Sequence, residues 1–210
     1  ALARELEKPL LIVNIGGVAN ATWLGAAGEI IACDTGPGNG PLDDLAQTHL
    51  GQPYDKGGAL AAAGQVDQER LRQLLAHPFF AQPAPKSLDR LSFSSLIDQA
   101  TQGLAPPDAA ATLAAFICAA IAQTPFPALP KQVLVTGGGR HNATLMAGLA
   151  ARFAVPVRPV EAVGWNGDAL EAQCFGFLAV RTLRGLPLSL PSTTGVRAPQ
   201  TGGRIYGTIL

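Results

Sequence analysis

The sequence predicts an α/β domain with a mixed β-sheet. Short runs of branched apolar residues open the chain, and in its second half similar runs alternate with helical patterns. Glycine-rich turns follow several of the predicted strands, as is common where a strand leads into a helix of an α/β layer. The length of 210 residues suits one large domain or two small ones, and it is ample for a buried core.

Three predicted strands open the chain. Residues 10–15 (LLIVNI) form a short apolar run that ends at Gly16 and Gly17, which is typical of a buried strand. Residues 20–24 and 29–33 are two further runs, and the GAAG sequence between them predicts a hairpin. We therefore expect the three strands to be neighbours and antiparallel.

A helix is predicted over residues 41–50, after the glycine-rich segment DTGPGNG of residues 34–40. Pro41 suits a first helical turn, and the acidic residues that follow it suit the positive end of the helix dipole. Residues 51–107 are irregular in pattern, with short helices expected near 67–76 and 93–99. We interpret this stretch as an insertion within the domain.

The second half alternates helices and strands more regularly. Asp108, Asn142 and Asp168 each precede a helical pattern, and each is a residue type that caps helices. The expected elements are a helix over 108–123, a strand over 132–136, a helix over 142–153, a strand over 155–160, a helix over 168–184 and an irregular tail from residue 187. The resulting order is βββα, the insertion, and then αβαβα.

Composition narrows the classes of partner. Fifteen basic and fifteen acidic residues give a formal net charge of zero, which argues against broad binding to nucleic acid or to an anionic membrane. No apolar run approaches the ~20 residues of a membrane-spanning helix, and the first residues lack the pattern of a signal peptide. We therefore expect a cytoplasmic location. Charged residues are only 14% of the chain, against about 25% in an average domain, so part of the surface is expected to be covered by a partner.

The cysteines give no sign of a metal site. Cys33, Cys118 and Cys174 are far apart, and the three histidines are equally scattered. We expect three buried thiols in a reducing compartment.

The segment DTGPGNG is the most informative candidate site. Glycines at 36, 38 and 40 would let backbone N–H groups approach an anion, and the following helix would add its partial positive charge. Asp34, at the end of a predicted strand, is suited to act as a general base or near Mg²⁺. The alternative is a tight turn in which Asp34 caps the loop backbone.

Two further glycine turns follow strands. Gly137, Gly138 and Gly139 would let a nucleotide lie against the backbone, or would equally serve close packing of a helix on a strand. They do not complete a dinucleotide-binding motif, and the chain has no GxxxxGK[ST] phosphate loop. Asn14 and Gly16 belong to the turn that closes the first strand.

Two single residues are weaker candidates. Glu171, one turn into the last long helix, is either an exposed helix residue or a carboxylate facing a cleft. Lys86, in APKSLDR, is either a basic contact for a phosphate or sugar or part of a solvated loop.

Taken together, these segments resemble the C-terminal part of the anhydro-N-acetylmuramic acid kinase family. The matching stretches are NIGGVAN (14–20), DTGPGN (34–39), PYDKGGALAAAGQV (53–66), FFAQPAPKS (79–87), ATLAAF (111–116), VLVTGGGRHNATLM (133–146) and GDALEAQCFGFLAVRTLRGLPLSLPSTTG (167–195). The resemblance covers nearly the whole chain. It implies one lobe of the actin-like ATPase (ribonuclease H-like) fold, with helices on both faces of the sheet.

The resemblance also implies chemistry. The family uses ATP and Mg²⁺ to open the 1,6-anhydro ring of a recycled cell-wall sugar, with phosphorylation of its O6. By this resemblance, Asp34 corresponds to the family's catalytic base. The family's second phosphate turn corresponds to Gly36, Gly38 and Asn39, and its nucleoside turn to Gly137, Gly138 and Gly139. Glu171 corresponds to a glutamate that faces the sugar. Asn14 and Gly16 fall beside the cleft, and Lys86 is kept as a candidate contact for substrate.

The chain departs from the family in three places. Leu88 and Asp89 stand where the family usually has Thr-Gly, and GNxLMD becomes GNGPLDD. The family's first phosphate loop, a Gly-Thr-Ser-x-Asp-Gly segment, is missing, as is the lobe that holds the sugar. We therefore expect residues 1–210 to be the C-terminal lobe of a two-lobe kinase without its N-terminal lobe, inactive alone, and by analogy able to form a homodimer. The alternative is a non-catalytic nucleotide-binding or assembly module of the same fold.

Overall fold

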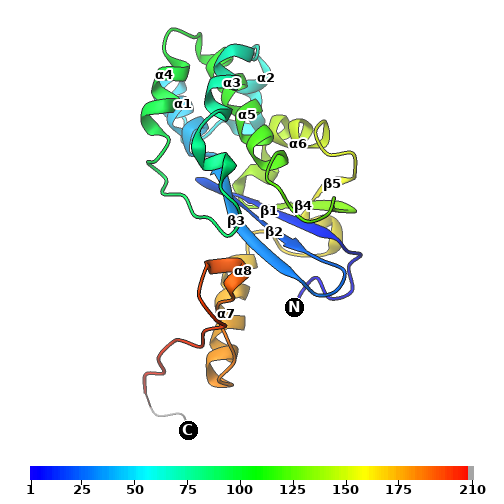
Figure 1. Cartoon of the computed structure of the whole chain (residues 1–210). Coiled ribbons are helices and arrows are strands. Elements are labelled where there is room, and N and C mark those ends of the chain that lie inside the picture. Colours follow the sequence, from blue (N-terminus) through cyan, green and yellow to red (C-terminus); the bar gives the residue numbers. More distant parts are fainter. Residues whose placement is uncertain (208–210) are drawn as a thin grey trace.

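The computed structural model describes residues 1–207 of the chain (Figure 1). Its elements follow the predicted order. They are β1 (Leu10–Ile15), β2 (Val18–Leu24), β3 (Ile30–Pro37), α1 (Gly40–Leu50), η1 (Lys56–Gly58), α2 (Ala59–Ala62), α3 (Gln68–Leu75), η2 (Pro78–Ala81), α4 (Ser94–Thr101), α5 (Pro106–Ala122), β4 (Gln132–Thr136), η3 (Gly138–His141), α6 (Ala143–Ala150), β5 (Val157–Pro159), η4 (Val160–Val163), α7 (Leu170–Leu183) and α8 (Pro191–Thr194).

The strands form one five-stranded mixed sheet in the order β3-β2-β1-β4-β5. The pairs β1–β2 and β2–β3 are antiparallel, whereas β1–β4 and β4–β5 are parallel. The mixed sheet and its antiparallel three-strand start are therefore confirmed. Because β1 and β4 are parallel neighbours, the turns that follow them meet at the same edge of the sheet.

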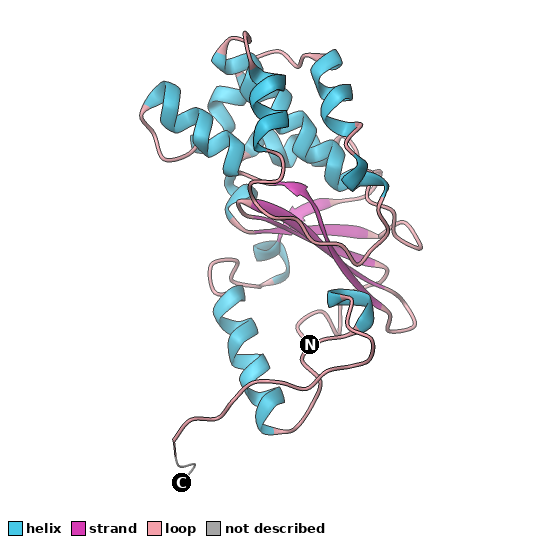
Figure 2. Cartoon of the chain, turned by 60° about the vertical axis from the view of Figure 1, so that its left-hand side comes forward, coloured by secondary structure: helices cyan, strands magenta, loops and turns pink. Residues whose placement is uncertain are grey.

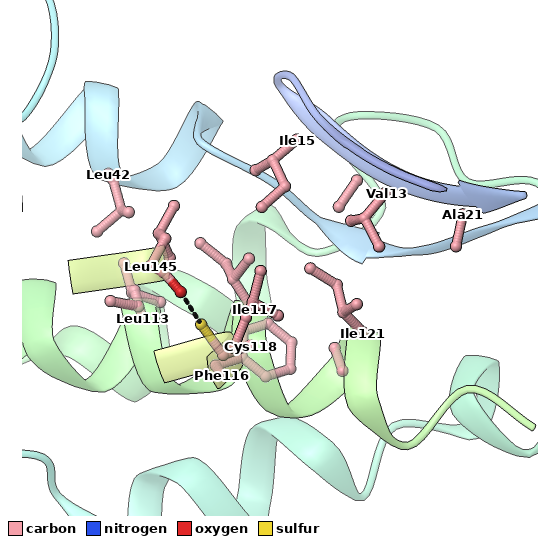
Figure 3. Close-up of a cluster of buried hydrophobic side chains, with 14 of the residues drawn as sticks. Val13, Ile15, Ala21, Leu42, Leu113, Phe116, Ile117, Cys118, Ile121 and Leu145 are labelled. Carbon is pink, nitrogen blue, oxygen red and sulfur yellow. Dashed lines mark hydrogen bonds between the residues drawn. The ribbon is translucent and has the colours of Figure 1, made fainter. Parts of the chain in front are cut away.

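Alternation along β1 assigns the two faces of the sheet. Val13 and Ile15 point into the main core, whereas Leu10 belongs to a second, small cluster. Helix α5 covers the main-core face with eleven buried residues, among them Phe116 and Ile117. Figure 3 shows this core, in which the Cys118 thiol donates a hydrogen bond of 3.4 Å to the Leu145 carbonyl.

Residues 51–107 pack onto α5 and share its core. Helices α2 and α3 contact α5, and the rings of Phe79, Phe80, Phe93 and Phe116 stack in edge-on and tilted pairs with centroids 5.6–6.1 Å apart. The segment is irregular in sequence because its helices are short and its ordering comes from aromatic packing rather than from helical periodicity.

Helices lie on both sides of the sheet, but the two layers are very unequal (Figures 1 and 2). On the second face the small cluster contains Ala3, Leu10, Leu134 and Val160. It is covered by the N-terminal segment, η4 and the start of α7. Helix α7 itself has no buried residue and extends away from the sheet.

Several local predictions were wrong, each for an identifiable reason. β3 continues through Pro37, so the first part of the DTGPGNG segment is strand rather than loop. Asp108 does not cap α5, which begins at Pro106, because its carboxylate accepts the Gln65 N–H at 2.7 Å. Asp168 does not cap α7 because it binds Arg140. Cys174 is exposed, since it lies on the uncovered helix α7.

Asn142 does cap α6, as predicted, by accepting the Leu145 N–H at 3.0 Å. Across residues 1–207, no helix has the length and apolar character needed to cross a membrane.

Candidate functional site

Two of the glycine turns bind each other directly. The N–H of Gly38 donates to the Gly17 carbonyl at 3.0 Å, and that of Asn39 donates to the Gly16 carbonyl at 2.6 Å. The Asn39 side chain adds a bond of 3.2 Å from Nδ2 to the carbonyl of Ile15, the last residue of β1. The start of α1 is thus fixed to the end of β1.

The third turn closes on the same point. Gly137 has φ of 76°, and a Cβ on it would overlap Asn14 Oδ1. A Cβ on Gly139 would lie 2.5 Å from Ile15 Cβ, and one on Gly138 would lie 3.3 Å from Asn39 Nδ2. Only glycine permits the approaches at Gly137 and Gly139, and the structure brings the three predicted turns together.

The turn after β3 differs from the prediction in its hydrogen-bonding capacity. The N–H groups of Gly38 and Asn39 already donate to the first turn and do not point toward a ligand. Gly36 has φ of 148° and lies against Phe80 and Ala120 of the core, and a Cβ on Gly38 would overlap the Gly16 carbonyl. These glycines are therefore required by close packing within the protein, independently of any ligand.

The turn after β4 offers more to a ligand. Gly138 and Gly139 are the first two residues of η3, where N–H groups have no partner within the helix. The dipole of this short helix also points its positive end to the same place.

Asp34 is half-buried and lies within β3, which continues for three residues beyond it, rather than at the end of the strand as predicted. Its Oδ2 accepts the N–H of Leu88 at 2.6 Å, and its own N–H donates to the Lys86 carbonyl at 2.9 Å. Burial raises the pKa of Asp34, and the Leu88 hydrogen bond offsets part of that rise. The bond to Leu88 comes from the backbone, so the replacement of the family's threonine by leucine keeps this donor.

Asp34 lies in a row of polar residues that crosses four strands. Asn14 of β1 is opposite Asn20 of β2 and beside Thr136 of β4, and Asn20 is opposite Asp34. Residues directly opposite each other in a sheet share a face, so these four side chains project from the face that carries α7.

Asn20 was not predicted as a site residue. The signal that would have found it is the symmetry of NIGGVAN about Gly17, because a tight antiparallel turn centred there pairs Asn14 with Asn20.

Lys86 is directed into the protein. Its Nζ donates to the Phe79 carbonyl at 3.0 Å and lies 4.4 Å from the centroid of the Phe79 ring. Burial lowers the pKa of Lys86, partly offset by the nearby Cys33 thiol. In this arrangement Lys86 anchors the segment that holds Asp34, while its predicted contact with substrate stays a prediction.

Glu171 lies in the first turn of α7 and is exposed. Within residues 1–207, no hydrogen bond joins it to the glycine turns. The structure thus separates Glu171 from the converged turns, although Arg140, described below, connects their supporting segments.

A cavity of about 580 Å³ lies between the turns after β3 and β4. It is lined by both Asn39 and Gly138, by Tyr54 and Lys56 of the loop before α2, and by Asp43. Burial, together with the neighbouring Asp44, raises the pKa of Asp43 to about 6. A larger cavity of about 710 Å³ lies between α1 and α4 and is lined by Arg90 and His49 among others.

Metal-binding groups are sparse in this region. Among residues 1–207, no group of three His, Cys, Asp or Glu side chains could hold a metal ion.

Comparison with known proteins identifies close relatives. The family model described as "Anhydro-N-acetylmuramic acid kinase" matches residues 1–208. A protein of that name from Acidiphilium cryptum (strain JF-5) is 69% identical over 205 residues, which are 98% of this chain and 57% of the relative. One from Gluconobacter oxydans (strain 621H) is 55% identical over 97% of this chain and 58% of the relative. The chain thus spans a little over half the length of these curated relatives.

Two of the solved structures that match share little sequence with this chain. Component A of the (R)-2-hydroxyglutaryl-CoA dehydratase of Acidaminococcus fermentans aligns with a TM-score of 0.46 and 16% identity, over 71% of this chain and 54% of that one. A ROK family glucokinase from Streptomyces griseus aligns with a TM-score of 0.32 and 13% identity, over 71% of this chain and 55% of that one.

Proposed function

This chain belongs to the anhydro-N-acetylmuramic acid kinase family, and we propose that it forms the C-terminal lobe of an ATP-dependent sugar kinase. The substrate would be 1,6-anhydro-N-acetylmuramic acid, whose anhydro ring is opened and whose O6 is phosphorylated during peptidoglycan recycling in the cytoplasm. The observation that carries the proposal is the convergence of three glycine turns beside a cavity, with Asp34 in the polar row at the same edge of the sheet.

The cavity between Asn39 and Gly138 would receive the nucleotide. The backbone N–H groups of the Gly137–Gly139 turn would donate to an anion or a ribose, and Tyr54 and Lys56 would add an aromatic surface and a positive charge. The volume of about 580 Å³ lies within the range of sites for molecules of this size.

Asp34 would act as the general base. Its Oδ2 is engaged by Leu88, which fixes the carboxylate and leaves Oδ1 to accept a proton from water. The oxygen of that water bonds to C1 of the sugar as the C1–O6 bond breaks, and O6 takes the γ-phosphoryl group. A carboxyl group whose pKa is raised by burial is a better base near neutral pH than an exposed one.

Mg²⁺ would enter with the phosphates of ATP. When bound, it supplies charge neutralisation for phosphoryl transfer. Asp34 would be the carboxylate that faces it from this lobe, through water rather than directly.

The remaining part of the family's chain would complete the enzyme. Helix α7 exposes Phe175, Phe177, Val180 and Leu183, and the relatives are almost twice as long as this chain. We propose that the N-terminal lobe covers this apolar face and supplies the first phosphate loop and the sugar-holding residues. Homodimerisation through this lobe is a further part of the proposal.

Steady-state phosphorylation of 1,6-anhydro-N-acetylmuramic acid by the longer protein tests the function. Asp34→Asn should lower kcat by at least about a hundredfold while ATP binding persists, because the base is lost but the cavity is not. Asp44→Asn, an exposed neighbour in α1, is the matched control and should leave kcat unchanged. Residues 1–210 alone should show little or no turnover.

Two results would contradict the proposal. Unchanged turnover in Asp34→Asn removes Asp34 from the role of base. ATP binding without any phosphorylation of the sugar by the longer protein favours the alternative, a non-catalytic nucleotide-binding or assembly module.

A further inference from the structure

Arg140 is a buried cation at the back of the third glycine turn. Its side chain is only 4% exposed, and all three of its nitrogens donate hydrogen bonds. Nη1 binds the Gly137 carbonyl at 2.8 Å, Nε binds Glu161 Oε1 at 2.9 Å, and Nη2 binds Asp168 Oδ1 at 2.5 Å. A planar guanidinium can hold three such partners in one fixed arrangement, which the ammonium group of a lysine cannot do.

These partners belong to different parts of the site. Gly137 ends β4 and starts the turn predicted to meet the nucleoside. Glu161 lies in η4, and Asp168 lies two residues before the first residue of α7. Glu161 also accepts the N–H of Gly167 at 3.2 Å, so the segment that leads into α7 is held by the same carboxylate.

The space around the guanidinium is closely filled. A Cβ on Gly167 would lie 2.6 Å from Arg140 Nε. The hydrogen bond and positive charge of Arg140 lower the pKa of Asp168. For Glu161, burial raises the pKa, but the sum of its own backbone hydrogen bond, the Arg140 bond and the Arg140 charge lowers it. Both carboxylates are therefore ionised and bound to Arg140 at neutral pH.

Helix α7 contributes no residue to the main core, and its start packs on the small cluster of the other face through the partly buried Leu170. Arg140 is the side chain that joins the nucleoside turn to the start of the helix that carries Glu171. Arg140 itself does not line the cavity.

We propose that Arg140 is a positioning residue that couples the Gly137–Gly139 turn to the first turn of α7. It holds the groups predicted to meet the nucleoside and the sugar in one geometry, and its catalytic role rests on the function proposed above. Arg140→Met should release the Gly137 carbonyl and the two carboxylates together, so that both segments move relative to β4.

Amide chemical shifts of residues 1–210 test the coupling without any activity. In Arg140→Met, the amide signals of Gly138, Gly139 and Glu171 should all move, and Asp168→Asn should move the same signals by less. Arg158→Met is the matched control, since Arg158 makes a single exposed hydrogen bond to Gln132 at 3.0 Å. Unchanged glycine-turn and Glu171 signals in Arg140→Met would overturn the coupling, whatever the enzyme does.

Steady-state kinetics of the longer protein test whether this coupling affects catalysis. Arg140→Met should raise KM for ATP and lower kcat, each by about tenfold, because small displacements of positioning groups have effects of this size. Arg140→Lys should recover part of the loss, since it keeps the charge but not the planar geometry. Ile121→Val, a core change in α5 far from the turn, controls for lost stability.

The outcomes separate this proposal from the kinase function. Equal losses in Ile121→Val and Arg140→Met, or normal kinetics in Arg140→Met, would refute a positioning role. If the unmodified longer protein has no kinase activity, the proposed function fails, and the chemical-shift test still decides whether Arg140 couples the two segments.

Discussion

Helices α5 and α7 are the two longest helices, and they have opposite surroundings. Helix α5 has 17 residues, of which eleven are buried between the sheet and the helices of residues 51–107. Helix α7 has 14 residues and none is buried, although its sequence contains two phenylalanines and several branched or leucine residues. An apolar composition of this kind is typical of a helix that packs against a partner, and the N-terminal lobe proposed above would be that partner for α7.

The contrast explains the low charge of the chain. A domain that meets water on every side is expected to carry more charged residues than 14%. The deficit is located in part on α7, where Phe175 is 66% exposed and Leu183 is 59% exposed. Several exposed large apolar side chains on one helix support the interaction surface proposed above.

The largest expected difference between the two helices is in the loss of stability when a phenylalanine is replaced by alanine. Phe116→Ala in α5 should reduce the free energy of unfolding by about 3–5 kcal/mol, because it removes a fully buried ring and leaves a cavity. Phe175→Ala in α7 should change it by less than about 0.5 kcal/mol, because that ring is in water. Urea unfolding of residues 1–210 measures both values, and similar losses would show that α7 is packed.

Amide hydrogen exchange should show the next largest difference. Amides in the middle of α5 exchange only when the core opens, whereas those of α7 open locally, so protection should be at least about a hundredfold greater in α5. Mass spectrometry of peptides covering Ile117 and Phe177 measures the two rates. Equal protection would contradict the contrast, and gain of protection in α7 within the longer protein would support coverage by the other lobe.

A smaller effect concerns the start of α7 and depends on pH. The pKa of Asp168 is lowered in the folded chain by Arg140, so its contribution to stability is present at neutral pH and is lost as the pH falls through the folded pKa, below the ordinary value of 3.8. Asp168→Asn should lower the melting temperature slightly at pH 7 and by less at pH 3. Asp98→Asn, in α4, is the control. A difference that is as large at pH 3 as at pH 7 would show that charge is not its cause.

Ionisation of Asp43 should have the opposite effect on the stability of the folded state. Its pKa is raised from 3.8 to about 6 by burial, so ionisation at neutral pH disfavours the folded state. Asp43→Asn should raise stability at pH 7.5 by up to about 1 kcal/mol, after allowance for solvent screening of a half-exposed group, and should have no effect below pH 4. Unfolding at the two pH values checks this expectation.

Much of the fold was predictable from local sequence. The branched apolar runs and their glycine boundaries fix β1 and β4 to the residue, and Asn142 caps its helix as expected. The predicted helix caps at Asp108 and Asp168 were wrong, because each carboxylate binds a partner distant in sequence. Asp108 binds Gln65, and Asp168 binds Arg140. Local propensity has no information about such partners.

The candidate site was predictable only where short sequence patterns define it. The resemblance and the glycine patterns indicated which turns matter, and the structure brings those turns together. Placing Asn20 in the site required knowledge of the strand register, and the role of Arg140 became visible only from its contacts with residues distant in sequence. The inward direction of Lys86 also came from a distant partner, since its amine binds the Phe79 carbonyl and ring.

The central claim is that the converged glycine turns form a nucleotide site, and titration of residues 1–210 with Mg²⁺ and ATP tests it most directly. We expect saturable changes in the amide signals of Asn39, Gly138 and Gly139 at millimolar ATP, with Thr101 of the cavity between α1 and α4 unaffected. Absence of change at all three turn residues, or change confined to the α1–α4 cavity, would contradict the claim.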